Sequence, residues 1–212
     1  MSILSERCRK NHLTTALIVH YDTANTSPNI TISANTRQYT RGSVSAGSWF
    51  STRSLISRNS GKYYVEQKTI SLGSSANGEL MFGVGLSSFP LTTFAGSDST
   101  AWGIQNNPTG GTGANVWHNG SLVNASTWGG SVGDYFMIAV DFTAGNMWLG
   151  VNGSWYGGGN PSTGSVPTFT FTPGTLLYFI GSANNPPARG QSNAVVGEFS
   201  GLLPSGFSAW LP

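Results

Sequence analysis

Short apolar stretches alternate with polar, turn-rich stretches along the chain, and no stretch repeats apolar residues at helical spacing. The clearest element covers residues 133–155, where the apolar run 135–142 is followed by a turn and a second run, 147–151. β-Branched and aromatic residues suit a pleated sheet, whereas Gly145 and Asn152-Gly153 suit tight turns. The region therefore predicts a β-hairpin followed at once by a second turn.

Other short apolar or alternating segments predict further strands. In chain order they cover residues 15–21, 29–33, 37–41, 48–53, 62–71, 80–87, 101–105, 115–118, 176–182, 194–200 and 207–211. Even spacing and frequent turns favour an all-β fold, an antiparallel β-sandwich of two sheets. Because such a domain must bury large rings, five tryptophans are expected in its core: Trp49, Trp102, Trp117, Trp148 and Trp210.

The composition fits one all-β domain with an unusually uncharged surface. The chain has 212 residues, of which only 8% are charged, against about 25% in ordinary globular proteins. Its 29 glycines allow frequent tight turns. This composition is typical of secreted, extracellular or virion β-proteins, and a cytosolic β-domain with short loops is the alternative.

Positive charge gathers in the first third of the chain. Nine of the ten Lys and Arg residues, but three of the eight acidic residues, lie before residue 70. We expect residues 1–24 to form a docking arm anchored by Arg7, Arg9 and Lys10, and residues 25–212 to form the sandwich. The arm would face an acidic protein surface or a neighbouring copy. Nucleic acid is not expected, because the charges do not form a dense basic patch.

Cysteine content and hydropathy exclude several classes. Cys8 is the only cysteine, so an intrachain disulfide and a cysteine-based metal site are excluded. It is either a free surface thiol or an intermolecular bridge between two arms. No stretch has the pattern of a secretory signal or the length of a membrane span. We therefore expect no membrane insertion, and we expect no cofactor.

Several motifs resemble SPRY (B30.2-like) domains. The hairpin has a Gly-Asp opening at 133–134, a late Asp141, an aromatic second strand and Asn-Gly at 152–153. Residues 60–66 (SGKYYVE), 82–86 (FGVGL) and 116–120 (VWHNG) also fit that family. The segment 190–207 is similar to the closing part of SPRY domains from bacteriophage tail proteins. The resemblance implies a concanavalin-like jelly roll whose ligand contacts come from variable loops at one end.

Four long polar loops, 89–100, 106–114, 154–168 and 183–193, are the expected places for a binding site. Trp155 and Tyr156 lie on a Gly-rich loop and offer flat rings to a sugar, but the Asn-Gly-x-Trp pattern of the family favours Trp155 as a cap on the core. Together with the resemblance, these loops give the candidate ligand-binding residues Phe94, Asp98, Trp102, Trp155, Tyr156, Asn160, Asn184 and Arg189.

Catalysis has little support in the sequence. The three histidines lack metal-binding spacing, and His118 is expected to play a structural part in a turn. Asp134 and Asp141 lie at opposite ends of one predicted strand, roughly 23 Å apart, and cannot form a glycosidase pair. Asp141 is instead expected to satisfy backbone groups of the turn. The pair Glu79 and Asp98 stays open. We expect no metal site and no enzyme.

Three functions remain open. The first is a non-enzymatic virion protein of a bacteriophage, assembled in the host cytoplasm and present in several copies or as a homo-oligomer. It would contact other virion proteins through the arm and a host-surface glycan or protein through the loops, as a capsid decoration, head fibre or tail-tip component. The second is a free-standing SPRY protein-interaction or lectin-like module, and the third is a polysaccharide depolymerase. The closing segment and the arm favour the first.

Overall fold

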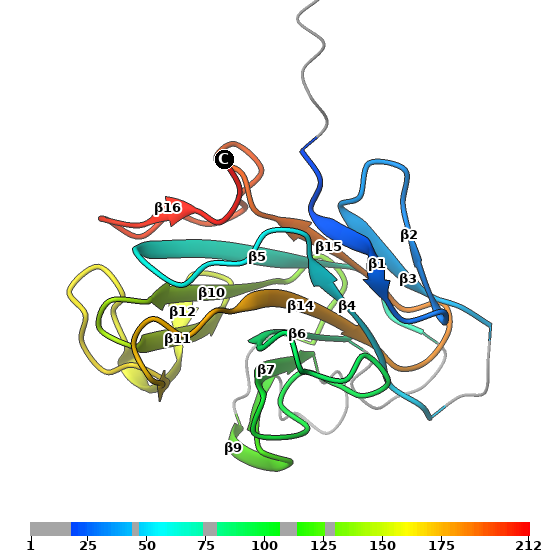
Figure 1. Ribbon diagram of the computed structural model, residues 1–212, viewed down its shortest axis with the longest axis horizontal. Helices are drawn as coiled ribbons and strands as arrows, with labels where there is room; N and C mark the ends of the chain where they lie inside the picture. The colour runs from blue at the N-terminus through cyan, green and yellow to red at the C-terminus, as the bar shows by residue number, and fades with distance from the viewer. Residues whose placement is uncertain (1–17, 44–46, 74–79, 107–113, 126–129) are drawn as a thin grey trace, which may run out of the picture.

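Two β-sheets stacked face to face make up the fold (Figure 1). The structure is a computed structural model, and it describes residues 18–43, 47–73, 80–106, 114–125 and 130–212. The predicted antiparallel β-sandwich is confirmed. The arm residues Arg7, Cys8, Arg9 and Lys10 lie outside the described residues.

The first sheet, called sheet A, has seven strands, and all its neighbouring strands are antiparallel. Across the sheet they are β1 (Tyr21–Thr26), β4 (Phe50–Ser54), β14 (Tyr178–Ala183), β6 (Leu80–Gly85), β7 (Ala101–Asn106), β8 (Ala114–His118) and β9 (Ser121–Ala125).

The second sheet, called sheet B, is built around the predicted hairpin. Across the sheet its strands are β12 (Ser154–Trp155), β11 (Asn146–Val151), β10 (Tyr135–Asp141), β5 (Lys62–Ser71), β15 (Arg189–Asn193), β3 (Gln38–Arg41) and β2 (Ile30–Ile32). Two short strands join it at the side, β13 (Phe169–Thr170) on β11 and β16 (Ser208–Ala209), which runs parallel to β5. A 3₁₀-helix, η1 (Tyr156–Gly158), follows β12.

The hairpin of β10 and β11 closes as predicted. Asp141 pairs with Asn146 across the turn, and its Oδ1 accepts hydrogen bonds from the N–H groups of Thr143 and Ala144 at 3.0 Å each. Its Oδ2 lies 3.0 Å from Lys62 Nζ on the neighbouring strand. The expected role of Asp141 in the turn is therefore confirmed.

Strict alternation along the strands divides the side chains between two clusters. In β10, Phe136, Ile138 and Val140 point into the core between the sheets, whereas Met137 and Ala139 belong to a second cluster on the outer face of sheet B. The C-terminal segment 199–207 covers that outer face, and the chain continues as β16 beside β5 (Figure 1). Sheet B is thus apolar on both faces.

The tryptophans only partly follow the expectation. Trp102, Trp148 and Trp210 are buried, as predicted. The prediction was wrong for Trp49 and Trp117, which are only partly buried. Trp117 follows the core residue Val116 in β8, so alternation turns its ring to the outer face of sheet A.

The strands β12 and β15 lie where loops were predicted, and the predicted strand 194–200 is absent. β15 falls within the predicted loop 183–193, and the apolar stretch 194–200 forms turns rather than a strand. β15 is polar because its side chains bond across the sheet, for example Gln38 Nε2 to Gln191 Oε1 at 2.8 Å. The apolar stretch instead packs on the sheet, where the Phe199 ring lies 4.9 Å from that of Tyr64.

The first strand begins before the predicted end of the arm. β1 starts at Tyr21, whose side chain is fully buried and packs edge-on against Tyr39 at 5.4 Å. The boundary between 24 and 25 therefore falls inside β1. Within the described part of the chain, no helix has the length and apolar character needed to cross a bilayer.

Candidate functional site

A loop lies flat on the outer face of sheet A because two glycines leave room for it. Gly83 and Gly103 pair directly across β6 and β7. A Cβ on Gly103 would lie 2.0 Å from the carbonyl oxygen of Ala95, and one on Gly83 would lie 2.6 Å from the Ala95 Cβ. The segment 89–100 can therefore pack against the sheet, which fixes the position of Phe94.

Beside this loop, three aromatic side chains surround a hollow of about 180 Å³. We call it the aromatic hollow, and its lining residues are Trp49, Met81, Phe94, Gln105 and Trp117. The Phe94 ring centroid lies 5.5 Å from that of Trp49 and 5.7 Å from that of Trp117. Trp117 Nε1–H donates to Gln105 Oε1 at 2.8 Å, which orients the indole.

Two predicted site residues near this face have structural roles. The buried Trp102 stacks on His118, with ring centroids 4.9 Å apart and planes 6° from parallel. His118 Nδ1–H donates to the Ala101 carbonyl at 2.9 Å, in line with the structural role expected for this histidine. Asp98 Oδ1 accepts from both the N–H and the hydroxyl of Thr100, so this carboxylate stabilises a turn.

The Gly-rich loop after β11 divides its candidate residues between core, turn and surface. Tyr156 is buried and its hydroxyl donates to the Ala114 carbonyl. Asn160 Oδ1 accepts from the Ser162 N–H at 3.0 Å and stabilises an exposed turn. Trp155 is half-buried, and it both packs on the outer cluster of sheet B and lines a groove there. The expectation that Trp155 caps apolar residues is thus met at the outer cluster, while its contact with a sugar stays a prediction.

Asn184 lies in the connection between β14 and β15, and Arg189 is the first residue of β15. The Asn184 Oδ1 is buried without a hydrogen bond, and Arg189 makes no ion pair within the described residues. The eight predicted residues are not gathered at one site. Phe94 lines the aromatic hollow on sheet A, whereas Trp155 lines a groove on sheet B, the opposite face of the sandwich.

The groove on sheet B has a volume of about 540 Å³. β10 and β12 contribute Tyr135, Met137 and Trp155, and the segment 200–205 forms the facing wall. Sequence reasoning missed Tyr135. Its position in the strand could have revealed it, because strict alternation turns Tyr135 to the face opposite the inward-pointing residues of β10.

A buried carboxylate holds the wall of this groove. Glu66, on the outer face of β5, has no exposed surface, and its oxygens accept from the N–H groups of Ser200 at 2.7 Å and Gly201 at 2.9 Å. The Tyr64 hydroxyl donates to Glu66 Oε1 at 2.7 Å. Burial and the Glu66 charge raise the pKa of Tyr64, so this hydroxyl remains a donor.

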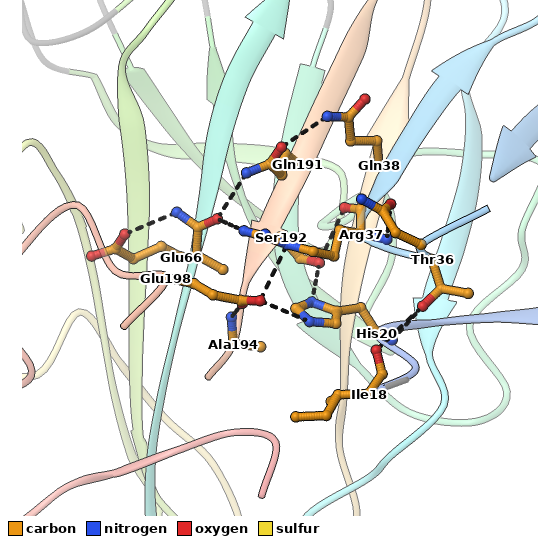
Figure 2. Close-up of polar contacts among 12 residues, drawn as sticks. Ile18, His20, Thr36, Arg37, Gln38, Glu66, Gln191, Ser192, Ala194 and Glu198 are labelled. Atoms are coloured by element: carbon orange, nitrogen blue, oxygen red, sulfur yellow. Dashed lines mark hydrogen bonds and ion pairs between the residues drawn. The ribbon is translucent and has the colours of Figure 1, made fainter. Parts of the chain in front are cut away.

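A polar cluster joins the segment before β1 to β3 and β15 (Figure 2). His20 Nδ1 lies 2.8 Å from Ser192 Oγ, while His20 Nε2 and Arg37 Nε lie 3.5 Å and 3.2 Å from Glu198 Oε1. Burial favours a higher pKa for Glu198, but His20 and Arg37 together lower the pKa below its usual value. The cluster has the residue types of a hydrolase triad. Ser192 and His20 are, however, almost fully buried, so no substrate reaches the serine.

Asp134 and Asp141 lie at the two ends of β10 and do not face one another, as predicted. Asp134 lies before β10 and accepts from the Ser131 N–H at 2.8 Å, while Asp141 ends the same strand. Glu79 lies outside the described residues, so the pair with Asp98 stays untested. In the described part of the chain, no three His, Cys, Asp or Glu side chains are grouped as metal ligands.

Comparison with known structures identifies the fold. The SPRY domain of human HERC1 is similar over 81% of this chain and 96% of its own, with a TM-score of 0.60 and 18% identity. The TRIM65 PSpry domain is similar over 82% of this chain and 89% of its own, with a TM-score of 0.55 and 16% identity. Neither a protein-family model nor a curated protein matches the sequence. The chain therefore has the SPRY-type β-sandwich fold.

Proposed function

We propose that this chain is a protein-interaction module that docks its partner at the aromatic hollow. The observation that carries the proposal is the convergence of Trp49, Phe94 and Trp117, all partly exposed, on one concave site. Aromatic side chains are enriched at the centres of protein interfaces. The fold supports the proposal, because SPRY domains are typically protein-interaction modules.

The size and chemistry of the hollow define the partner's contact. At about 180 Å³ it is smaller than the pockets that enclose drug-sized ligands, about 300–1,000 Å³. No charged side chain lines it. It therefore suits one apolar or aromatic side chain that projects from a partner protein, with the three rings as its walls.

Affinity capture with matched variants tests this function. The full chain, Trp117→Ala and the control Val196→Ala are immobilised, and proteins captured from the native source are quantified by mass spectrometry. Val196 is an exposed apolar residue on the sheet B side. We expect at least one protein to bind the full chain and Val196→Ala but to drop tenfold or more with Trp117→Ala. Equal capture by all three, with circular dichroism showing folded variants, would overturn the proposal.

We also propose a bacteriophage particle as the setting of this module. The low content of charged residues, the 29 glycines and the similarity of the segment 190–207 to phage tail SPRY domains support this setting. In it, Arg7, Arg9 and Lys10 would contact other virion proteins. Immunogold labelling of particles from the native source, with antibody against residues 25–212, tests it. Gold on the head or tail is expected, and unlabelled particles with accessible antigen in the lysate would contradict it.

A further inference from the structure

The groove on the outer face of sheet B has rigid walls. The Ser205 N–H donates to Ser162 Oγ at 3.0 Å, which ties the segment 200–205 to the turn after η1. Glu66 holds the other end of the segment through the N–H groups of Ser200 and Gly201. The volume of about 540 Å³ lies within the range of small-ligand pockets. The groove is thus preorganised rather than formed by a ligand.

Polar groups around the groove have no partner within the described protein. The Tyr135 hydroxyl and the Trp155 indole N–H, both on half-buried rings, make no hydrogen bond there, and neither do the hydroxyls of Ser200 and Ser205. Half-buried Tyr and Trp side chains usually use these groups. These four groups are therefore available to a ligand.

The lining also excludes a charged ligand. No Asp, Glu, Lys, Arg or His side chain lines the groove, and the nearby Glu66 already accepts bonds from Tyr64, Ser200 and Gly201. A charged ligand would lose hydration without gaining a counter-charge. The ligand is therefore neutral, with apolar faces for the rings and polar groups for the hydroxyls.

From this combination we infer that the groove binds a neutral oligosaccharide. Sugar rings present an apolar C–H face that packs on aromatic rings, here those of Tyr135 and Trp155. Sugar hydroxyls both donate and accept, as do the hydroxyls of Tyr135, Ser200 and Ser205. An extended proline-rich peptide also docks in aromatic grooves, but it offers mainly carbonyl acceptors and leaves these acceptor sites unused.

This inference goes beyond protein docking at the aromatic hollow and does not depend on it, because the two sites lie on opposite faces of the sandwich. On a virion, the groove would provide the contact with a host-surface glycan.

A glycan array of neutral oligosaccharides, probed with the full chain, tests the inference. The strongest binders are then titrated into ¹⁵N-labelled protein, and the Trp155 indole signal is assigned with Trp155→Phe. We expect this signal to shift and the double variant Tyr135→Phe with Ser200→Ala to weaken binding at least tenfold. The control Tyr178→Phe, on sheet A, is expected to bind normally, as is Trp117→Ala.

Three results would overturn the inference. The first is the absence of any saccharide that shifts the Trp155 signal at millimolar concentration. The second is saccharide binding that the groove variants leave unchanged. The third is a shift of the Trp155 signal by a proline-rich peptide but by no sugar. Tyr135→Phe and Ser200→Ala remove only hydroxyl groups, so loss of folding does not confuse the comparison.

Discussion

At the scale of single residues, a few carboxylates fix the turns that shape this molecule. Asp141 was predicted from its place at the end of an apolar run, and the structure confirms its role through Thr143, Ala144 and Lys62. Glu66 serves a comparable role for Ser200 and Gly201, but the sequence does not reveal it. The difference is physical, because the backbone donors to Asp141 are its neighbours in sequence, whereas those to Glu66 lie more than 130 residues away.

Removal of the Asp141 carboxylate should destabilise the hairpin of β10 and β11. We expect Asp141→Ala to lower the free energy of unfolding by about 2 kcal/mol, because two backbone N–H donors and Lys62 lose their partner. Urea denaturation measures the change. The control Asp22→Ala, at a partly exposed site in β1, removes two hydrogen bonds near the surface and should cost less. A loss from Asp141→Ala no larger than that from the control would contradict the role assigned to Asp141 in the turn.

Stability should fall in acid because two carboxylates are favoured in their charged form. Burial opposes ionisation of Asp141 and Glu198, but hydrogen bonds and neighbouring cations leave the pKa of each below its usual value. When the pKa of a carboxyl group is lower in the folded protein than in the unfolded chain, its ionised form stabilises the fold. This stabilisation is complete above the pKa of the unfolded chain, about 4, and is lost as the pH falls through the pKa of the folded protein.

We therefore expect the Tm to be constant above about pH 5 and to drop steadily below about pH 4. Differential scanning calorimetry of the full chain and of Asp141→Asn measures this dependence. Asp141→Asn should have a lower Tm than the full chain above pH 5, and its Tm should fall by fewer degrees between pH 4 and pH 2. Parallel curves for both proteins would contradict the assigned role of Asp141.

Replacing Glu66 by its amide should release the groove wall. In Glu66→Gln, the side-chain NH₂ must face a backbone N–H or the Tyr64 hydroxyl proton, so one bond becomes a clash of donors. We expect a loss of about 2–3 kcal/mol and faster amide exchange at Ser200 and Gly201. Hydrogen exchange measures both residues, with Tyr64→Phe as the control that removes only one bond. Unchanged exchange in the variant would show that the wall does not depend on the carboxylate.

At the scale of elements, the local sequence pattern predicted most strands. The positions of the other strands depend on contacts with residues far away in the sequence. β5 covers residues 62–71 as predicted, because its residues alternate between two buried faces. β15 was missed because its residues are polar. Its side chains form hydrogen bonds with those of Arg37 and Gln38, and its backbone pairs with β5, so the strand depends on residues far away in sequence. The stretch 194–200 looked like a strand because it is apolar, but it covers a sheet instead.

The packing of the segment 89–100 on sheet A depends on the absence of a side chain at Gly103. In Gly103→Ala, the new Cβ would lie 2.0 Å from the Ala95 carbonyl oxygen, so the segment 89–100 must lift from the sheet. We expect faster hydrogen exchange across 89–100 and loss of the partner captured through the aromatic hollow. Exchange in β10 and β11, on the other sheet, should stay unchanged. A variant with unaltered exchange in this loop would contradict the packing described.

At the scale of the whole molecule, the SPRY-type sandwich has two concave surfaces on opposite faces, the aromatic hollow and the groove on sheet B. The predicted site residues were taken from polar loops and from resemblance, and the structure places Phe94 in the aromatic hollow and Trp155 in the groove on sheet B. Trp49 and Trp117 were assigned to the core because large rings usually pack there. The exposure of Trp117 depends on its phase in β8, which became visible only once the register of sheet A was known, whereas Trp49 lies just before β4.

Site-specific photo-crosslinking tests the central claim, that the aromatic hollow is the protein-docking surface, most directly. Phe94 is replaced by the aromatic photoreactive residue p-benzoylphenylalanine, and Val196 is replaced in the same way as a control. After irradiation with proteins from the native source, we expect one defined crosslinked protein from position 94 that is absent from position 196. The same products from both positions, or none from position 94 in a folded protein, would contradict it.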